Sequence, residues 1–244
     1  YDEPWIKTTT RILKGKPFVE IDYQIGPIPI DDDVGKEIIV RYNSPVRNGA
    51  TFFTDSNGRE FLQRRRNHRP TWNIAVYEPI AGNYYPIGAA IYMEDDEQSF
   101  SVVTDRSQGG GSISDGTMEV MVHRRTVVDD FRGVSEPINE TDIGITPCRP
   151  WGNATRLGKG MVIRGTHRVL VGEGGKGARL ARSVMDDAFA EPIVFVASAP
   201  SSQDIPFQTM GFSGISQPLP TSVMVLTKRR LYGSLSASNN SLTY

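Results

Sequence analysis

The chain has 244 residues, a length that suits one large β domain or one and a half smaller domains. Its 27 basic and 28 acidic side chains give a formal net charge of −1, which argues against a nucleic-acid-binding surface. Hydrophobic residues make up 38% of the chain, which is enough to form a buried core. No apolar run approaches the length of about 18 residues that a membrane-spanning helix needs.

Alternating apolar and polar residues predict strands in much of the first half of the chain. Residues 18–25 (FVEIDYQI) and 37–42 (EIIVRY) show the two-residue period of a half-buried strand. Residues 52–54 and 59–62 flank the turn Asp55-Ser56-Asn57-Gly58 and predict a hairpin, because Asn-Gly tolerates the positive φ of a tight turn.

A second hairpin is predicted where residues 91–93 and 100–103 flank the acidic turn Glu94-Asp95-Asp96-Glu97. Residues 118–123 (MEVMVH) alternate again, after a turn at Asp115-Gly116. Turn signals spaced by roughly 8–12 residues favour an antiparallel β-sandwich.

One segment, residues 178–190 (ARLARSVMDDAFA), has apolar residues near helical spacing. Strand patterns precede it at residues 168–171 and follow it at 193–196. We therefore expect a mainly β fold, an antiparallel β-sandwich with one short helix near 178–190.

Three N-glycosylation sequons begin at Asn139, Asn153 and Asn239, and the first two lie in a polar stretch with Gly and Pro that is typical of a surface loop. A glycan acceptor must be exposed, so we expect passage through the secretory pathway. We divide the chain into a β-sandwich region at 1–140, a glycosylated loop at 141–160 and a continuation of the β-rich region at 161–244.

The single cysteine, Cys148, stands between two prolines in the same stretch. It cannot form a disulfide within this sequence, so it is either a buried thiol or half of a bridge to another segment. A catalytic thiol would need a histidine partner, and none is close in sequence.

The segment Gly172-Glu173-Gly174-Gly175-Lys176-Gly177 lies between a strand pattern and the helix, as in a dinucleotide-binding turn. The acidic residue that should follow the next strand is missing, and so are further βα units. Gly177 also stands where a P-loop needs Ser or Thr. We expect a simple glycine loop, with a nucleotide-binding enzyme as the more remote alternative.

The three histidines, His68, His123 and His167, are each followed by arginine and match no zinc-binding spacing. A catalytic zinc needs about three protein ligands, so we expect no metal held by this chain alone. Acidic residues are plentiful, but spacing does not select the pair of carboxylates that glycoside hydrolysis requires. No catalytic residue is therefore assigned in this chain.

A dense polar region runs from Thr104 to Gly133 and contains the pairs Asp105-Arg106 and Arg124-Arg125. Forked arginines and carboxylates on adjacent strands can hold sugar hydroxyls, or they can pair with each other and brace a loop. For the basic run Arg64-Arg65-Arg66, we expect ion pairing with the acidic turns, because alternation on a strand prevents a single patch.

Long blocks of the sequence resemble the α-mannosidases of the lysosomal or vacuolar kind, which belong to glycoside hydrolase family 38. The similarity is nearly continuous from Glu20 to Asn139 and looser as far as Leu226, and the tail from Lys228 to Tyr244 does not share it. The blocks are FTDSNGRE (53–60), RNHRPTW (66–72), EPIAGNYYP (78–86), TDRSQGG (104–110), MVHRR (121–125) and DDFRGVSEP (129–137).

The resemblance implies part of a retaining acid α-mannosidase that removes terminal non-reducing α-mannose from N-glycans and oligosaccharides in the lysosome or vacuole. In this family zinc is bound by histidines and aspartates of an N-terminal α/β domain, and one of those aspartates is the nucleophile. All of them precede the region matched here. The resemblance thus implies a β-rich part that supports the zinc-bearing polypeptide and is inactive alone, within an oligomeric enzyme.

The family also lends a contact to the sugar from its β-rich part, which we assign to Arg124 and Arg125. We add Asp105 and Arg106 as further candidates for substrate binding. The alternative to an enzyme subunit is a noncatalytic carbohydrate-binding β-sandwich, and mannose-containing glycans are the expected ligands in both cases.

Overall fold

The computed structural model describes residues 3–127, 140–145 and 158–189, and further along residues 216–217, 219–220 and 223. One compact unit covers Tyr1–Glu191 and a second covers Pro192–Tyr244. The predicted strand at 193–196, Cys148 and the sequon asparagines Asn139, Asn153 and Asn239 lie outside the described residues. The division at residues 140 and 160 stays a prediction. No helix in the described part is long and apolar enough to cross a bilayer.

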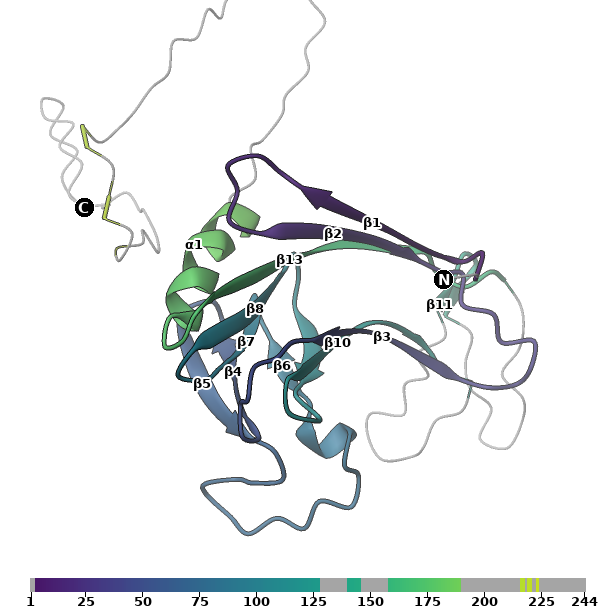
Figure 1. The fold of residues 1–244 in the computed structure, drawn as a ribbon. Coiled ribbons are helices and arrows are strands. Elements are labelled where there is room, and N and C mark those ends of the chain that lie inside the picture. The colour runs from purple at the N-terminus through teal and green to yellow at the C-terminus, as the bar shows by residue number, and fades with distance from the viewer. Residues whose placement is uncertain are drawn as a thin grey trace, which may run out of the picture. The chain divides into compact units, whose positions relative to one another are not determined.

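The first unit is built on a seven-stranded antiparallel sheet, called sheet A (Figure 1). Its longest strand, β13, pairs with β2 on one side and β8 on the other. In spatial order the strands are β1 (Ile6–Ile12), β2 (Val19–Ile25), β13 (Ile163–Glu173), β8 (Gln98–Thr104), β7 (Ala90–Glu94), β4 (Thr51–Ser56) and β5 (Glu60–Arg65).

A four-stranded antiparallel sheet, sheet B, lies against one face of sheet A (Figure 1). Its strands are, in order, β3 (Lys36–Asn43), β10 (Thr117–Arg125), β9 (Gln108–Gly111) and β6 (Tyr85–Ile87). A 3₁₀ turn, η1 (Ala81–Asn83), precedes β6, and a small hairpin pairs β11 (Glu140–Thr141) with β12 (Gly144–Ile145).

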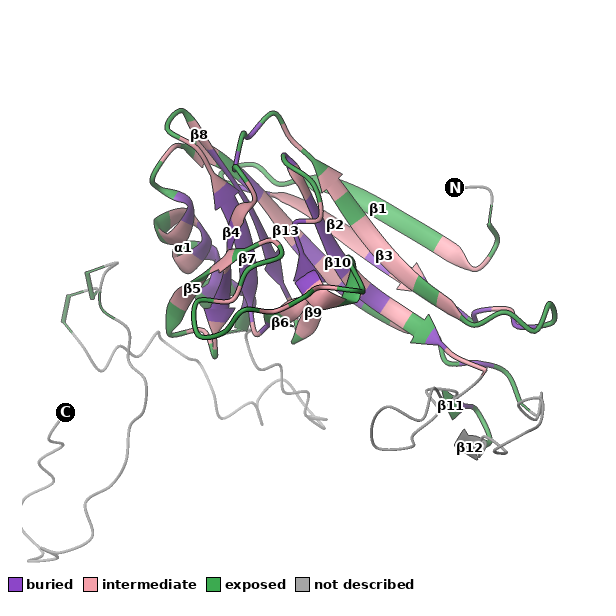
Figure 2. Ribbon diagram, turned by 90° about the horizontal axis from the view of Figure 1, so that it is seen from below, coloured by how far each residue is buried: buried purple, intermediate pink, exposed green. Residues whose placement is uncertain are grey.

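The core between the sheets consists of apolar side chains that alternate inward along both sheets, and Figure 2 shows buried residues concentrated on these inner strands. The fully buried members of this cluster are Phe52, Ile87, Ile91, Met93, Val102, Met118 and Val120. Because such interiors are packed as tightly as organic crystals, the cluster fixes how the two sheets face each other.

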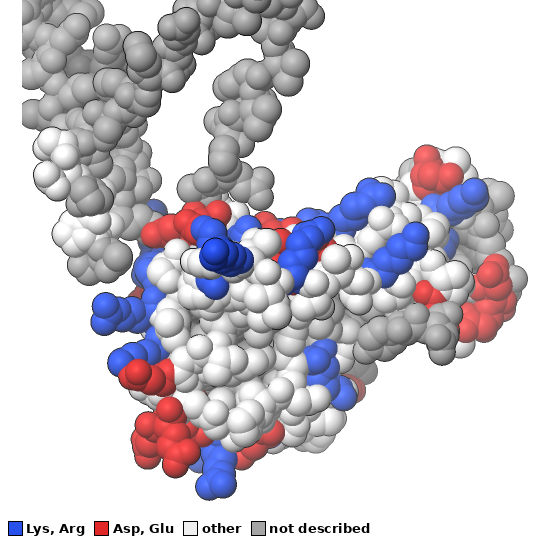
Figure 3. Space-filling model, turned by 45° about the horizontal axis from the view of Figure 1, so that its top comes forward, with Lys and Arg blue, Asp and Glu red and all other residues white. Residues whose placement is uncertain are grey.

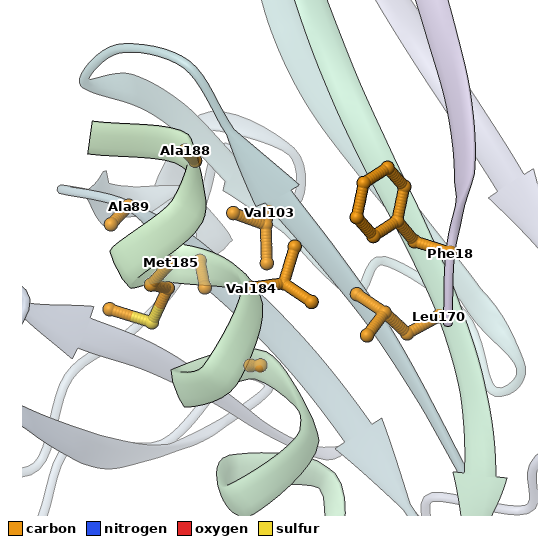
Figure 4. Packing of buried hydrophobic residues seen from close by; sticks show 9 residues of the cluster. Phe18, Ala89, Val103, Leu170, Val184, Met185 and Ala188 are labelled. Carbon is orange, nitrogen blue, oxygen red and sulfur yellow. The ribbon is translucent and has the colours of Figure 1, made fainter. Parts of the chain in front are cut away.

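The helix α1 (Gly177–Phe189) covers the outer face of sheet A. Ala181, Val184, Met185 and Ala188 pack from the helix against residues such as Leu170 of β13, as Figure 4 shows. The α1 bounds agree with the predicted helix within one residue. The predicted fold class, an antiparallel β-sandwich with one short helix, is confirmed.

Five strands were missed by the sequence pattern: β1, β6 and β9 in the two sheets, and the short β11 and β12 of the small hairpin. The strand β9 contains Gly109-Gly110-Gly111, which would normally suggest a turn. A Cβ at Gly110 would lie 2.6 Å from the carbonyl oxygen of Glu119, and one at Gly111 would lie 2.4 Å from that of Asn83. Glycine is thus required here by close backbone approach.

Candidate functional site

Asp105 and Arg106 follow β8 and form an ion pair with each other. The carboxylate accepts from Nε and Nη2 of Arg106 at 3.1 and 3.0 Å, and from the backbone N–H of Thr166 at 3.1 Å. Arg106 also donates to the carbonyl oxygen of Arg164. Asp105 therefore raises the pKa of Arg106, and the pair braces the turn after β8 against β13.

Arg124 and Arg125 end β10 and, because successive strand residues face opposite ways, they have different surroundings. Arg124 is exposed and lies 3.6 Å from the carboxylate of Glu37 on β3. Arg125 is buried, and its Nη1 donates to the carbonyl oxygen of Ile28 at 2.8 Å. Burial lowers the pKa of Arg125.

The surroundings of Arg125 are closely packed. A Cβ at Gly160 would lie only 2.7 Å from Nη1 of Arg125, so this glycine lets the chain pass next to the guanidinium. The side chain of Arg125 thus holds the segment around Ile28 against the end of β10, and any contact that Arg125 makes with a ligand would have to come from its backbone.

A polar network that the sequence did not predict lies between the sheets, centred on His167 of β13. Its ring is fully buried, with Nδ1 2.8 Å from the hydroxyl of Tyr42 and Nε2 2.9 Å from Oε1 of Gln108. Gln108 donates in turn from Nε2 to the carbonyl oxygen of Met121 at 3.1 Å and to the hydroxyl of Tyr23 at 3.2 Å.

The direction of these hydrogen bonds follows from Gln108. Its amide nitrogen must face the carbonyl of Met121, which places its oxygen toward His167. Nε2 of His167 therefore carries the proton, and Nδ1 accepts from Tyr42. Burial lowers the pKa of His167 to about 4 and raises that of Tyr23 to about 12. The network is neutral, closed to solvent at His167, and suited to joining the sheets.

The glycine segment at 172–177 is filled by the protein's own groups. The N–H of Gly177, the first residue of α1, donates to Oε2 of Glu94 at 3.0 Å, so a carboxylate already occupies the position that a phosphate would take. A Cβ at Gly174 would lie 2.3 Å from the carbonyl oxygen of Asp95. The strand β13 is antiparallel to both neighbours, whereas a dinucleotide fold needs parallel strands. This geometry does not support nucleotide binding.

Among the described residues, no three His, Cys, Asp or Glu side chains are grouped so as to hold a metal ion. Both ring nitrogens of His167 are engaged, and Nε2 of His123 lies 3.1 Å from the carbonyl oxygen of Met161. The residues of the described part therefore do not fit a zinc site.

The charged side chains form local ion pairs. Of the basic run, Arg66 forms an ion pair, but with Asp115 in the Asp-Gly turn before β10 rather than with the acidic turn at 94–97. Arg64 instead donates to Oγ1 of Thr54 at 3.1 Å. On the outer face of sheet A, Arg11 of β1 pairs with both Glu20 and Asp22 of β2. Figure 3 shows basic and acidic side chains interspersed over the face it draws.

The comparisons with known proteins agree on one family. Residues 1–132 match the family described as the glycosyl hydrolases family 38 C-terminal domain. The lysosomal alpha-mannosidases of Mus musculus and Homo sapiens are 42% and 41% identical to the chain, over 93% and 91% of its length and 21% of theirs. A probable alpha-mannosidase of Arabidopsis thaliana is 39% identical over 93% of the chain and 22% of that protein.

Among solved structures, an alpha-mannosidase from Enterococcus faecalis V583 gives a TM-score of 0.48 at 15% identity, over 72% of this chain and 18% of that one. The chain thus spans about a fifth of the length of the relatives it matches.

Proposed function

Because this chain belongs to glycoside hydrolase family 38, through its C-terminal domain, we propose that it is the β-rich part of a retaining acid α-mannosidase. The whole enzyme removes terminal non-reducing α-mannose from N-glycans and oligosaccharides. The observation that supports this proposal is identity of about 40% to lysosomal alpha-mannosidases over more than nine tenths of the chain.

In this proposal the catalytic chemistry lies in the four fifths of the enzyme that these 244 residues do not cover. The zinc ion supplies Lewis-acid chemistry there and is held by that polypeptide. The described part of the chain supports this division of labour, since its buried carboxylates and its buried histidine are engaged with the chain's own groups. Its role is to support the catalytic polypeptide.

For the sugar site we propose the exposed Arg124 as the side chain that reaches substrate, and the backbone of Arg125 as the adjacent contact. Asp105 and Arg106 contribute to this site indirectly, because they form an ion pair with each other and hydrogen bonds to the backbone of β13. The names of two relatives support the lysosome as the location. The vacuole as the equivalent compartment, the route through the secretory pathway and an oligomeric assembly are further parts of the proposal.

The test compares the 244-residue chain with the full-length enzyme on an aryl α-mannoside. We expect turnover by the full-length enzyme alone, with retention of the anomeric configuration by NMR and loss of activity on removal of zinc. Hydrolysis by the 244-residue chain would overturn the proposal. Mannose binding by that chain, together with an inactive full-length protein, would favour the noncatalytic sugar-binding β-sandwich.

A further inference from the structure

The long loop between β5 and β6 is rigidly closed at its base. The N–H of Asn67 donates to Oδ1 of Asn83 at 2.8 Å, and Nδ2 of Asn83 donates back to Oδ1 of Asn67 at 2.7 Å. Nδ2 of Asn83 also donates to the carbonyl oxygen of Pro79 at 2.8 Å, and Asn83 itself is buried. The two asparagines thus act as a clasp that fixes both ends of the loop.

Arg69 adds a second brace across the same loop. It donates to the carbonyl oxygens of His68 and Gly82, and its guanidinium carbon lies 4.8 Å from the ring centroid of Tyr85 at the start of β6. Arg64 lies 4.4 Å from the centroid of the same ring. These contacts fix residues 67–69 and 79–83 at the base of the loop, so the base has little conformational freedom left to lose when the loop binds a partner.

This braced loop presents large apolar side chains to solvent. Trp72, Tyr77 and Ile80 are 60%, 88% and 55% exposed, and we call these three residues the apolar crest. Figure 1 shows the loop projecting beyond both sheets. A single exposed apolar residue is ordinary, but three on one loop with a fixed base make that loop a candidate interaction site. Trp and Tyr are among the residues most enriched at the centres of interfaces.

We propose that the apolar crest docks onto the catalytic polypeptide of the same enzyme. This rests on the proposed function, since it takes the rest of an α-mannosidase as the partner. The chain spans about a fifth of its relatives' length, so a large surface of the same enzyme is available to cover it. The aliphatic Ile80 offers no ring for a sugar to stack on, which favours an apolar protein pocket over a glycan.

The first experiment is hydroxyl-radical footprinting with mass spectrometry on the full-length enzyme and on the 244-residue chain. We expect oxidation of Trp72 and Tyr77 to be lower in the full-length enzyme by about tenfold, because the centre of an interface excludes water. Met93 and Met118 are fully buried and serve as controls, since they stay unoxidised in any sample whose sandwich is folded.

Equal labelling of Trp72 in both samples, in an enzyme that hydrolyses α-mannoside, would overturn the docking site and leave the proposed function standing. An inactive full-length protein in which Trp72 is protected would overturn the proposed function and leave the docking site standing. Protection that appears only when a mannose oligosaccharide is added would also overturn the proposal, because it identifies a glycan as the occupant.

A second experiment uses variants of the full-length enzyme. The double variant Trp72→Ser, Tyr77→Ser is expected to lower the temperature at which the enzyme loses activity. The matched control is Val171→Ser, an apolar residue that is 70% exposed on β13 rather than on the crest. Equal effects of the two variants would contradict the proposal.

Discussion

The hydroxyl of Tyr42 on β3 donates to Nδ1 of His167 on β13 over 2.8 Å, and this hydrogen bond joins the two sheets within the core. His167 has no exposed surface, and burial lowers its pKa from the usual 6.5 to about 4. Two charged groups also act on the pKa of His167: the charge of Asp105 raises it, and that of Arg106 lowers it further.

The first prediction concerns pH. Between pH 6.5 and 4 the unfolded histidine binds a proton and the folded one does not, so the free energy of unfolding falls as the pH falls through this range. The loss is about 3 kcal/mol in total, from about 1.4 kcal/mol per pH unit. His167→Gln should be less stable at pH 7 and should show a weaker pH dependence in urea unfolding.

The control for this prediction is His68→Gln, since His68 is exposed. It should leave the stability difference between pH 7 and pH 4.5 unchanged. If His167→Gln kept the full pH dependence of the unaltered protein, the buried imidazole would not be its source.

The second prediction concerns Asp55, a buried carboxylate beside the first hairpin. Its Oδ1 accepts from the N–H groups of Ala89 and Ala90 at 2.7 and 2.9 Å, and its Oδ2 accepts from that of Gly58 at 2.7 Å. Asp55→Ala leaves these donors without their acceptor and should lower the free energy of unfolding by about 3–5 kcal/mol.

Asp55→Asn provides the graded control. Its amide oxygen can still accept from Ala89 and Ala90, but its nitrogen cannot accept from Gly58, so an intermediate loss is expected in chemical denaturation. Equal losses for the two variants would contradict this gradation, because they would show that the acceptor for the N–H of Gly58, which both variants lack, accounts for the whole effect.

The third prediction separates the two arginines at the end of β10. Arg125→Ala removes a buried donor to Ile28 and should cost about 2–4 kcal/mol of stability. Arg124→Ala removes an exposed ion pair and should cost no more than about 0.5 kcal/mol.

In the full-length enzyme Arg124→Ala should raise KM for an α-mannoside while the melting temperature stays the same. Arg124→Lys should restore part of the binding, since it keeps the charge but not the forked geometry. An unchanged KM in Arg124→Ala would rule out the proposed substrate contact by this side chain.

The fourth prediction uses two glycines of the segment before α1. A Cβ at Gly177 would lie 2.5 Å from the ring of Tyr92, so Gly177→Ala should destabilise the chain by about 1–3 kcal/mol through crowding. Gly175 has open space around it but a φ of +69°, so Gly175→Ala should cost about 1 kcal/mol through backbone strain alone. Thermal unfolding measures both.

The same thermal unfolding experiment tests the nucleotide-binding alternative. Added NAD or ATP should leave the melting temperature of the unaltered protein unchanged, because Glu94 caps the helix where a phosphate would bind. A saturable rise in melting temperature would contradict this.

The local elements of the fold could be predicted because their signals are local. Asn57 and Gly58 have the positive φ expected of the first hairpin turn, and Gly116 has it in the turn before β10. The strand β9 could not be predicted from its own residues. Its glycines are needed because the backbone of Glu119 on β10 and of Asn83 in η1 approaches them closely, and these contacts arise only in the folded chain. Side-chain period carries no information in a run of glycines.

The candidate site shows the same limit. Alternation along β10 predicts that Arg124 and Arg125 face opposite ways, but only the structure shows which of them is buried. For Asp55, the turn sequence accounts for the bond from Gly58. The bonds from Ala89 and Ala90 join residues that are more than 30 positions away and follow from packing of β4 beside β7.

The place of β13 in sheet A has a consequence for biosynthesis. In the described sheet, β2 is hydrogen-bonded to β1 and to β13, so β13 is the strand that connects the β1–β2 pair to β8. The ribosome makes Ile25 long before it makes Ile163, and at about 5–20 residues per second the interval is on the order of ten seconds. During that time the edge of β2 that β13 later covers has no partner. We therefore expect the nascent chain to be a client for chaperones that shield unpaired strands.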